Sequence, residues 1–184
     1  MVFGMIILIS LIVLVVLGIV IYNTLIQQRE SVRNAWSQID VQLKRRHDLV
    51  PNLVATAKKY MEHEQQTLEN VTKARQQAVD AGNIQDRQAA ENFLTSTLRS
   101  LFAVVENYPN LKADRQMAQL HEELTSTENR IAFARQYYND EVNRYNVSIA
   151  SVPNNVVAQL FNFDKVDFFE IENMAQREAP KVEF

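Results

Sequence analysis

The chain opens with a long run of apolar residues, and no charged side chain precedes Arg29. As an α-helix, the almost purely aliphatic stretch over residues 5–22 spans about 27 Å, close to the hydrocarbon thickness of a bilayer. The pattern therefore predicts a short tail (residues 1–4) followed by a transmembrane helix (residues 5–22). The residues predicted to span the membrane include Met5, Ile9, Ile12, Val16, Ile19 and Tyr22.

A cleaved signal peptide is the main alternative for this segment. A signal peptide needs a basic region before the apolar run and a cleavage site between small residues. Here no Lys or Arg precedes the run, and residues 21–24 form a poor cleavage site. A buried core helix is disfavoured because the run is apolar on every face. We therefore expect an uncleaved, single-pass anchor in the lipid bilayer.

The basic residues near the anchor predict its orientation. Arg29, Arg33 and the run Lys44–Arg46 follow the span, whereas only the amino terminus precedes it. The positive-inside rule then places the C-terminal domain in the cytoplasm. A domain on the periplasmic or external side stays open as the alternative.

The rest of the chain shows helical periodicity between widely spaced breakers. Apolar residues recur at spacings of three and four, which is typical of helices with one buried face. This pattern predicts an antiparallel helical bundle over residues 23–163. The first expected helix continues from the anchor to about His47. Three more are expected over residues 52–79, 84–107 and 117–149. A short last helix is expected to end at Leu160, with Asn154 or Asn155 as its N-cap.

Two residues that can interrupt a helix, Pro51 and Gly82, lead to specific expectations. Asp48 can cap a new helix whose first turn holds Pro51, or Pro51 can merely kink a helix that continues. Gly82 follows the helix over 52–79 and is expected in the left-handed conformation that often ends a helix.

The fourth helix shows the clearest pattern. Its apolar positions keep alternating spacings of three and four over several heptads, with one polar exception at Glu141. Such a period of 3.5 residues predicts coiled-coil-like packing. We name a set of apolar positions on this helix and the first one, predicted to face the interior of the bundle, the bundle seam. It comprises Trp36, Ile39, Leu43, Leu120, Leu124, Ile131, Tyr138 and Tyr145.

The C-terminal tail, residues 164–184, is expected to pack on the bundle. Phenylalanines gather toward this end of the chain, at positions 161, 163, 168, 169 and 184. They are expected to cover one end of the bundle. The alternative is that Phe168 and Phe169 contact the membrane or a neighbouring subunit.

Composition excludes several classes of protein. The 184 residues include 3 Gly, 4 Pro and no Cys. Scattered glycines exclude a glycine-rich phosphate loop, and scarce Gly and Pro argue against a many-stranded sheet. Without Cys there is no disulfide, thiolate metal site or cysteine nucleophile. A formal charge of −3 gives no general attraction to nucleic acid, so no nucleic-acid partner is expected.

No histidine fits a metal motif of helical proteins. A Glu-x-x-His site needs Glu three residues earlier, but Lys44, Tyr60 and Ala118 precede His47, His63 and His121 at that distance. The zinc-protease motif His-Glu-x-x-His fails as well, because Thr67 and Thr125 stand at its last position. We expect these histidines at the surface or at helix ends, and predict no catalytic residue and no cofactor.

The charged run Lys44–Arg46 is expected to be solvated or ion-paired rather than to bind phosphate. Asp40 and Lys44 have the spacing of a helical ion pair. Glu128 lies beside the bundle seam, where it is expected to pair with Arg45 or Arg46.

Several blocks of the sequence resemble the LemA family. They are residues 22–36 (YNTLIQQRESVRNAW), 35–54 (AWSQIDVQLKRRHDLVPNLV), 106–140, 144–163 (RYNVSIASVPNNVVAQLFNF) and 179–184 (APKVEF). The resemblance implies a bacterial protein with one N-terminal membrane helix and a long α-helical domain. A relative in magnetotactic bacteria is linked to formation of magnetosome membranes. The family supplies no established catalytic residue or cofactor to transfer.

Taken together, these features predict a non-enzymatic scaffold in the bacterial inner membrane that associates with itself and organises membranes. The alternative is an adaptor for another membrane complex, such as a protease or a signalling receptor.

Overall fold

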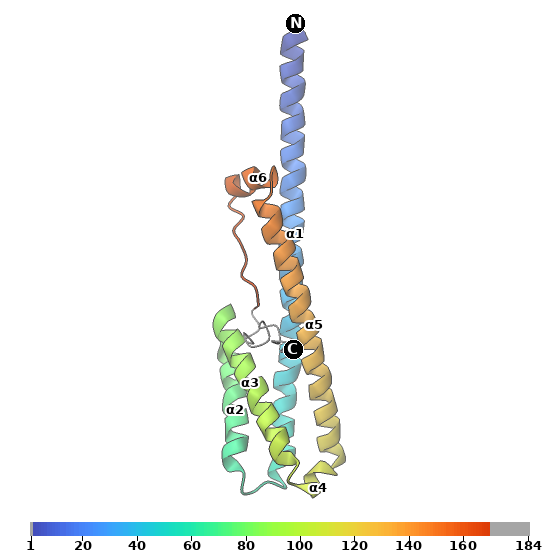
Figure 1. Ribbon diagram of the computed structural model, residues 1–184, viewed down its shortest axis with the longest axis vertical. Helices are drawn as coiled ribbons and strands as arrows, with labels where there is room; N and C mark the ends of the chain where they lie inside the picture. Colours follow the sequence, from blue (N-terminus) through green and yellow to red (C-terminus); the bar gives the residue numbers. More distant parts are fainter. Residues whose placement is uncertain (1, 170–184) are drawn as a thin grey trace, which may run out of the picture. The chain divides into compact units, whose positions relative to one another are not determined.

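The computed structural model describes residues 2–169, which form helices and no strand (Figure 1). The all-α prediction, with a long apolar helix at the N-terminus and helical packing behind it, is confirmed. The helices are α1 (Val2–Lys58), α2 (Gln65–Asp80), α3 (Ile84–Val105), α4 (Pro109–Lys112), α5 (Arg115–Ala150) and α6 (Asn154–Leu160).

The described residues divide into two compact units. The first, here the anchor unit, comprises residues 2–39 and 133–168; the second, here the bundle unit, comprises residues 40–132 together with Phe169. Helices α1 and α5 contribute to both units.

The bundle unit has one continuous apolar core. The final turns of α1 and the first half of α5 pack with α2, α3 and α4 around it, and α2 and α3 contact each other along their length. Its most buried members are Leu53, Ala57, Met61, Val71, Ala74, Leu94, Leu101 and Leu111. Phe93 of α3 lies outside this core, because its side chain is 48% exposed.

The anchor unit has a second core, formed by α1 and α5 and closed by α6. Leu25, Ala35 and Ile39 of α1 are fully buried, and Tyr138 and Tyr145 of α5 are nearly so. Beyond α6 an extended segment returns along α5. There Asn146 donates to the Val166 carbonyl oxygen at 2.8 Å and Tyr138 donates to that of Asp167 at 2.9 Å. The rest of the predicted tail, residues 170–184, lies outside the described residues.

Helix α1 continues through Pro51 and ends only at Lys58. The helix break predicted near Asp48 is therefore wrong, and the alternative of a continuing helix holds. The turn between α1 and α2 lies at residues 59–64, where Tyr60 and Met61 both donate to the Ala57 carbonyl.

Two other predicted end structures differ from those observed. No glycine has a positive φ, so Gly82 is not a left-handed cap, and α2 ends instead at Ala81 in an extended conformation. Helix α3 is capped by Asn83, whose side chain accepts from the Asp86 amide at 2.7 Å. At α6 the residue before the first turn is Pro153, and the predicted Asn cap is wrong because no side-chain cap bond is made there.

Candidate membrane anchor and buried charge cluster

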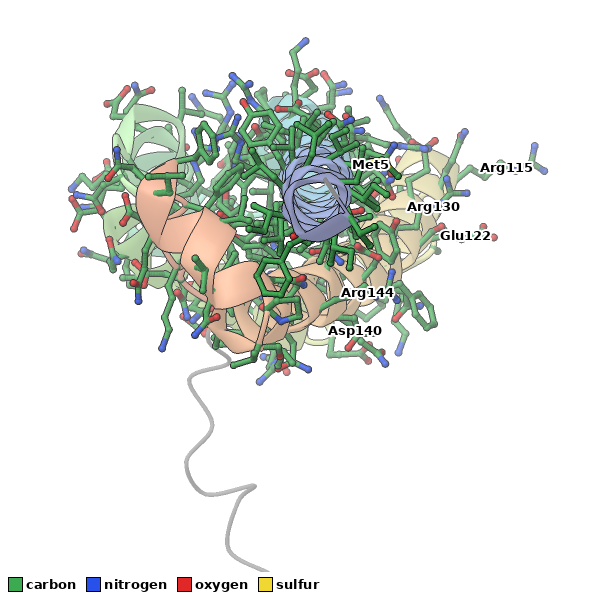
Figure 2. The ribbon with its side chains drawn as sticks, turned by 90° about the horizontal axis from the view of Figure 1, so that it is seen from above. Met5, Arg115, Glu122, Arg130, Asp140 and Arg144 are labelled. Carbon is green, nitrogen blue, oxygen red and sulfur yellow. The ribbon has the colours of Figure 1, made fainter. Side chains whose placement is uncertain are left out.

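The first turns of α1 present their apolar side chains to the surroundings. The large apolar side chains between Val2 and Val20 are between 44% and 81% exposed. Figure 2 labels Met5 on this part of the helix. In water such a surface would be unfavourable, whereas a helix satisfies all its backbone polar groups and is stable in lipid. This stretch is the one candidate membrane span among the described residues.

The predicted spanning residues lie along this exposed surface, except at its end. Met5, Ile9, Ile12, Val16 and Ile19 are 54–61% exposed. The Tyr22 ring instead lies against α6 and the residues after it, at 4.8 Å from the Phe161 ring and 5.7 Å from the Phe163 ring, measured between centroids. The exposed apolar surface of α1 therefore ends where α6 begins to cover the helix.

The C-terminal phenylalanines have different environments. Phe163 is buried, and the Arg29 guanidinium lies 5.2 Å from its ring centroid, a cation–π distance. Phe168 is 44% exposed, but Phe169 is completely buried. The alternative that Phe169 contacts the membrane or a neighbour is therefore wrong. Phe184 lies outside the described residues.

The structure distributes the bundle seam over both units. In the anchor unit Ile39, Tyr138 and Tyr145 are buried, and the rings of Trp36 and Tyr138 meet edge to face at 5.3 Å. The seam residues of the bundle unit are also buried. They are Leu43, Leu120, Leu124 and Ile131.

A cluster of charged side chains is buried in the bundle unit, around Arg46 of α1. Arg46 is 1% exposed and donates to the carboxylates of Glu91 on α3 and Glu128 on α5, the latter at 2.6 Å. It also donates to the Thr95 hydroxyl at 2.8 Å. The expected pairing of Glu128 with Arg45 or Arg46 is thus confirmed for Arg46. We name Arg46, His47, Glu91, Thr95 and Glu128 the charge cluster.

Glu91 is the most buried acid of this cluster, with a fully inaccessible side chain. Its second oxygen lies 2.8 Å from the His47 ring nitrogen Nε2. Burial by itself raises the pKa of Glu91, but the hydrogen bonds and charges of His47 and Arg46 outweigh burial and hold that pKa below its ordinary value. Glu91 is therefore a carboxylate that its neighbours keep ionised.

Sequence reasoning missed Glu91, although a signal was present. The apolar stripe of α3 runs through Leu94, Leu98 and Leu101, and Glu91 lies three residues before its first member. Arg46 interrupts the stripe of α1 in the same way, between Leu43 and Val50. Opposite charges inside two apolar stripes indicate a buried ion pair, because neither charge would be stable there alone.

Other expectations about charges and histidines need correction. The predicted pair of Asp40 and Lys44 is wrong, because Asp40 binds Arg87 at 2.5 Å and Lys44 lies 3.9 Å from Asp48. His63 and His121 are exposed as expected, but the His47 side chain is only 13% exposed. Within residues 2–169 no group of three potential ligands could hold a metal ion.

The outer face of α5 is strongly polar. Arg115, Glu122 and Arg130 project away from the ribbon (Figure 2), and so do Asp140 and Arg144. Charges of both signs lie on this face, and the exposed rings of Phe133 and Tyr137 lie between Arg130 and Asp140. A cavity of about 290 Å³ next to the charge cluster is lined by side chains that include Arg99, Phe102 and His121. The charge cluster joins α1, α3 and α5 through ion pairs of Arg46 with Glu91 and Glu128, and this geometry supports a structural role.

Comparisons with known proteins agree with this architecture. The model of the LemA family matches residues 35–184. The chain is 25% identical, over 175 residues, to "Magnetosome protein MamQ 2" of Paramagnetospirillum magneticum, with 81% of this chain and 64% of that protein covered. It is 26% identical, over 152 residues, to "Protein LemA" of Metamycoplasma hominis, with 80% of this chain and 68% of that protein covered.

These relatives also limit what can be transferred. The chain spans just under two thirds of the magnetosome protein's length. Neither the family name nor these relatives' names is that of an enzyme. The family model covers most of the chain, and the described residues form helices and no strand. The protein belongs to the LemA family.

Proposed function

We propose that this protein is a non-enzymatic scaffold, anchored in the inner membrane of a bacterium by α1, that associates with itself and helps to organise membranes. The observation that carries the proposal is the continuity of α1. One 57-residue helix begins as an exposed apolar surface and ends inside the core of the bundle unit. One helix therefore supplies both the predicted anchor and part of the core of the bundle unit.

Self-association is supported by an exposed aromatic pair on α5. Phe133 is 72% exposed and Tyr137, one turn later, is 44% exposed. Neighbouring aromatic side chains that face solvent are typical of interaction surfaces. A second copy of this chain is the partner that we propose, because anchoring confines copies to one plane and raises their effective concentration.

A role in membrane organisation is supported by the relatives. One of them is named a magnetosome protein. For the present chain we propose the more general activity of gathering copies at one area of membrane.

We also propose that the bundle unit faces the cytoplasm, because Arg29, Arg33 and Lys44 follow the span. Added protease should then cleave the bundle unit in inside-out vesicles and leave it intact in right-side-out vesicles. Cleavage of the bundle unit in right-side-out vesicles only would show that it lies on the opposite side of the membrane.

Crosslinking in intact membranes tests the scaffold. Because the natural chain has no Cys, a Phe133→Cys variant carries a unique thiol. A short thiol-to-thiol crosslinker should give a dimer of this chain, whereas Lys73→Cys, at an exposed site of α2, should not. The Phe133→Cys variant can also be treated with a thiol-to-amine crosslinker, which captures other proteins. If this variant forms no dimer but is reproducibly crosslinked to one other membrane protein, the protein is an adaptor and not a scaffold.

A further inference from the structure

The sequence contains a second uncharged stretch besides the N-terminal one. No Asp, Glu, Lys, Arg or His occurs from Tyr145 to Phe163, and none occurs before Arg29. Charged residues make up 22% of the chain, so 19 successive residues without one are unexpected in a segment exposed to water. Arg144 and Asp164 stand at the two ends of this stretch.

The structure brings the two uncharged stretches together in the anchor unit. α6 lies beside α1 (Figure 1), and the contact is made by Tyr22 with Phe161 and Phe163. Ile21, next to Tyr22, is only 8% exposed, whereas Val20 is 55% exposed. The second uncharged stretch is therefore held at the level where the predicted membrane span ends.

Most exposed side chains of this second stretch are apolar, and the exposed polar ones, Ser151, Gln159 and Asn162, are uncharged. We name its exposed apolar side chains the apolar tip: Val147 (56% exposed), Val152 (81%), Val156 (65%), Leu160 (72%) and Phe161 (53%). They come from the end of α5, the turn before α6, and α6 with the residue that follows it. A patch of this kind is costly to leave in water.

We propose that the apolar tip inserts into the boundary between head groups and acyl chains of the same bilayer that α1 crosses. This inference rests on the proposed anchoring by α1. The partner is a lipid surface, because the patch lies beside a helix already assigned to lipid and has no charged side chain that would oppose its burial against acyl chains. Tyr22, whose ring contacts those of Phe161 and Phe163, is a residue type enriched at membrane interfaces.

The positions of the charged residues nearest to the apolar tip agree with insertion at the membrane interface. On α1, Arg29 follows Tyr22 by seven residues, or about 10 Å of helix, which matches the thickness of the interfacial zone. The Arg29 guanidinium lies over the Phe163 ring, at the end of the uncharged stretch. The bilayer thus holds the anchor unit through two contacts, and the second contact fixes the depth and direction of α1.

Fluorescence quenching in vesicles tests the insertion. The full-length Leu160→Cys variant would be labelled with an environment-sensitive fluorophore and reconstituted into phosphatidylcholine vesicles containing lipids brominated near the head group. Leu14→Cys, in the middle of the span, reports anchoring in parallel vesicles whose lipids are brominated near the ends of the acyl chains. Val41→Cys is the exposed control, because its site on α1 is 63% exposed and lies about 28 Å of helix beyond Tyr22.

We expect brominated lipid to quench the label at residue 160 at least about half as strongly as the label at residue 14, and to leave the label at residue 41 unaffected. If the label at residue 14 is quenched and the label at residue 160 is not, the insertion is overturned while anchoring stands. An unquenched label at residue 14 overturns both.

Two further results also overturn the insertion. A label at residue 160 that is shielded from both brominated lipid and aqueous iodide is covered by protein, and equal quenching at residues 41 and 160 shows no specific contact. The Val156→Cys variant repeats the measurement at a second exposed site, in case the first substitution disturbs folding.

Discussion

Arg75 on α2 donates a hydrogen bond from its Nε to the carbonyl oxygen of His47 on α1, over 2.8 Å. In a helix this carbonyl would accept from the amide of residue 51, but Pro51 has no amide hydrogen. The side chain of Arg75 therefore replaces the hydrogen bond that proline removes. This replacement helps to explain how α1 continues through Pro51.

The replacement predicts that Arg75 and Pro51 are energetically coupled. Arg75→Met should lower the free energy of unfolding by about 1–3 kcal/mol, because it leaves a partly buried carbonyl without a partner. In a Pro51→Ala background the helix supplies its own amide, and the same substitution should cost less than about 1 kcal/mol. Chemical denaturation of the four proteins of this cycle measures the coupling.

Lys73→Met is the matched control for this cycle, since Lys73 is exposed on the same helix. Its effect should stay within about 0.5 kcal/mol in both backgrounds. Equal costs of Arg75→Met with and without Pro51 would show that the hydrogen bond does not compensate for the proline.

The charge cluster makes a second prediction. Glu91→Gln should destabilise the protein by about 3 kcal/mol, because Arg46 and His47 lose a buried carboxylate while Glu128 still faces Arg46. Glu122→Gln, the same change on the outward face of α5 in Figure 2, should have an effect within about 0.5 kcal/mol. Thermal unfolding followed by circular dichroism compares them; similar melting temperatures would exclude a stabilising ion pair.

The pH dependence of stability follows from the same residue. The pKa of Glu91 is lower in the folded protein than its ordinary value of 4.5, because His47 and Arg46 of α1 outweigh the effect of burial. This carboxylate therefore contributes stability above about pH 4.5, and the contribution is lost as the pH falls through the folded pKa.

The difference in unfolding free energy between the natural protein and Glu91→Gln should accordingly shrink on acidification below pH 4.5. Denaturation of both proteins over a pH series measures this difference. Asp114, whose pKa is also lowered, is present in both proteins and cancels. A difference that is constant or grows on acidification would contradict the assignment.

The bundle seam supplies a further prediction. Ile131→Asp should destabilise by about 4 kcal/mol or more, because Ile131 is fully buried and the new carboxylate would have no positive partner built for it. Val41→Asp introduces the same charge at a site that is 63% exposed, and it should stay within about 0.5 kcal/mol. Comparable melting temperatures for the two variants would place Ile131 outside the core.

Much of this fold could be predicted from helical periodicity. The apolar stripe through Leu25, Val32, Ile39 and Leu43 identifies the buried face of α1, and the heptads locate α5 within a few residues of its ends. Helix ends were less predictable. The continuation through Pro51 depends on Arg75, which lies 24 residues away in sequence, so no local pattern could show it.

The charge cluster was predictable in part, again from helical periodicity. Glu128 could be paired with Arg46 because it lies beside a regular seam, whereas Glu91 was overlooked although it falls on an apolar stripe. The apolar tip could not be found from periodicity, because α6 is short and its exposed face becomes apparent only when the fold places it against Tyr22.

The particle mass of the full-length protein in lipid nanodiscs tests the central claim, that this anchored chain associates with itself. Each copy contributes 21.2 kDa, so the number of copies follows from the protein mass per disc after subtraction of the belt protein and lipid. We expect discs that hold two or more copies at dilutions where unrelated single-pass proteins occupy discs singly. Discs that hold one copy at every protein-to-disc ratio would contradict the scaffold.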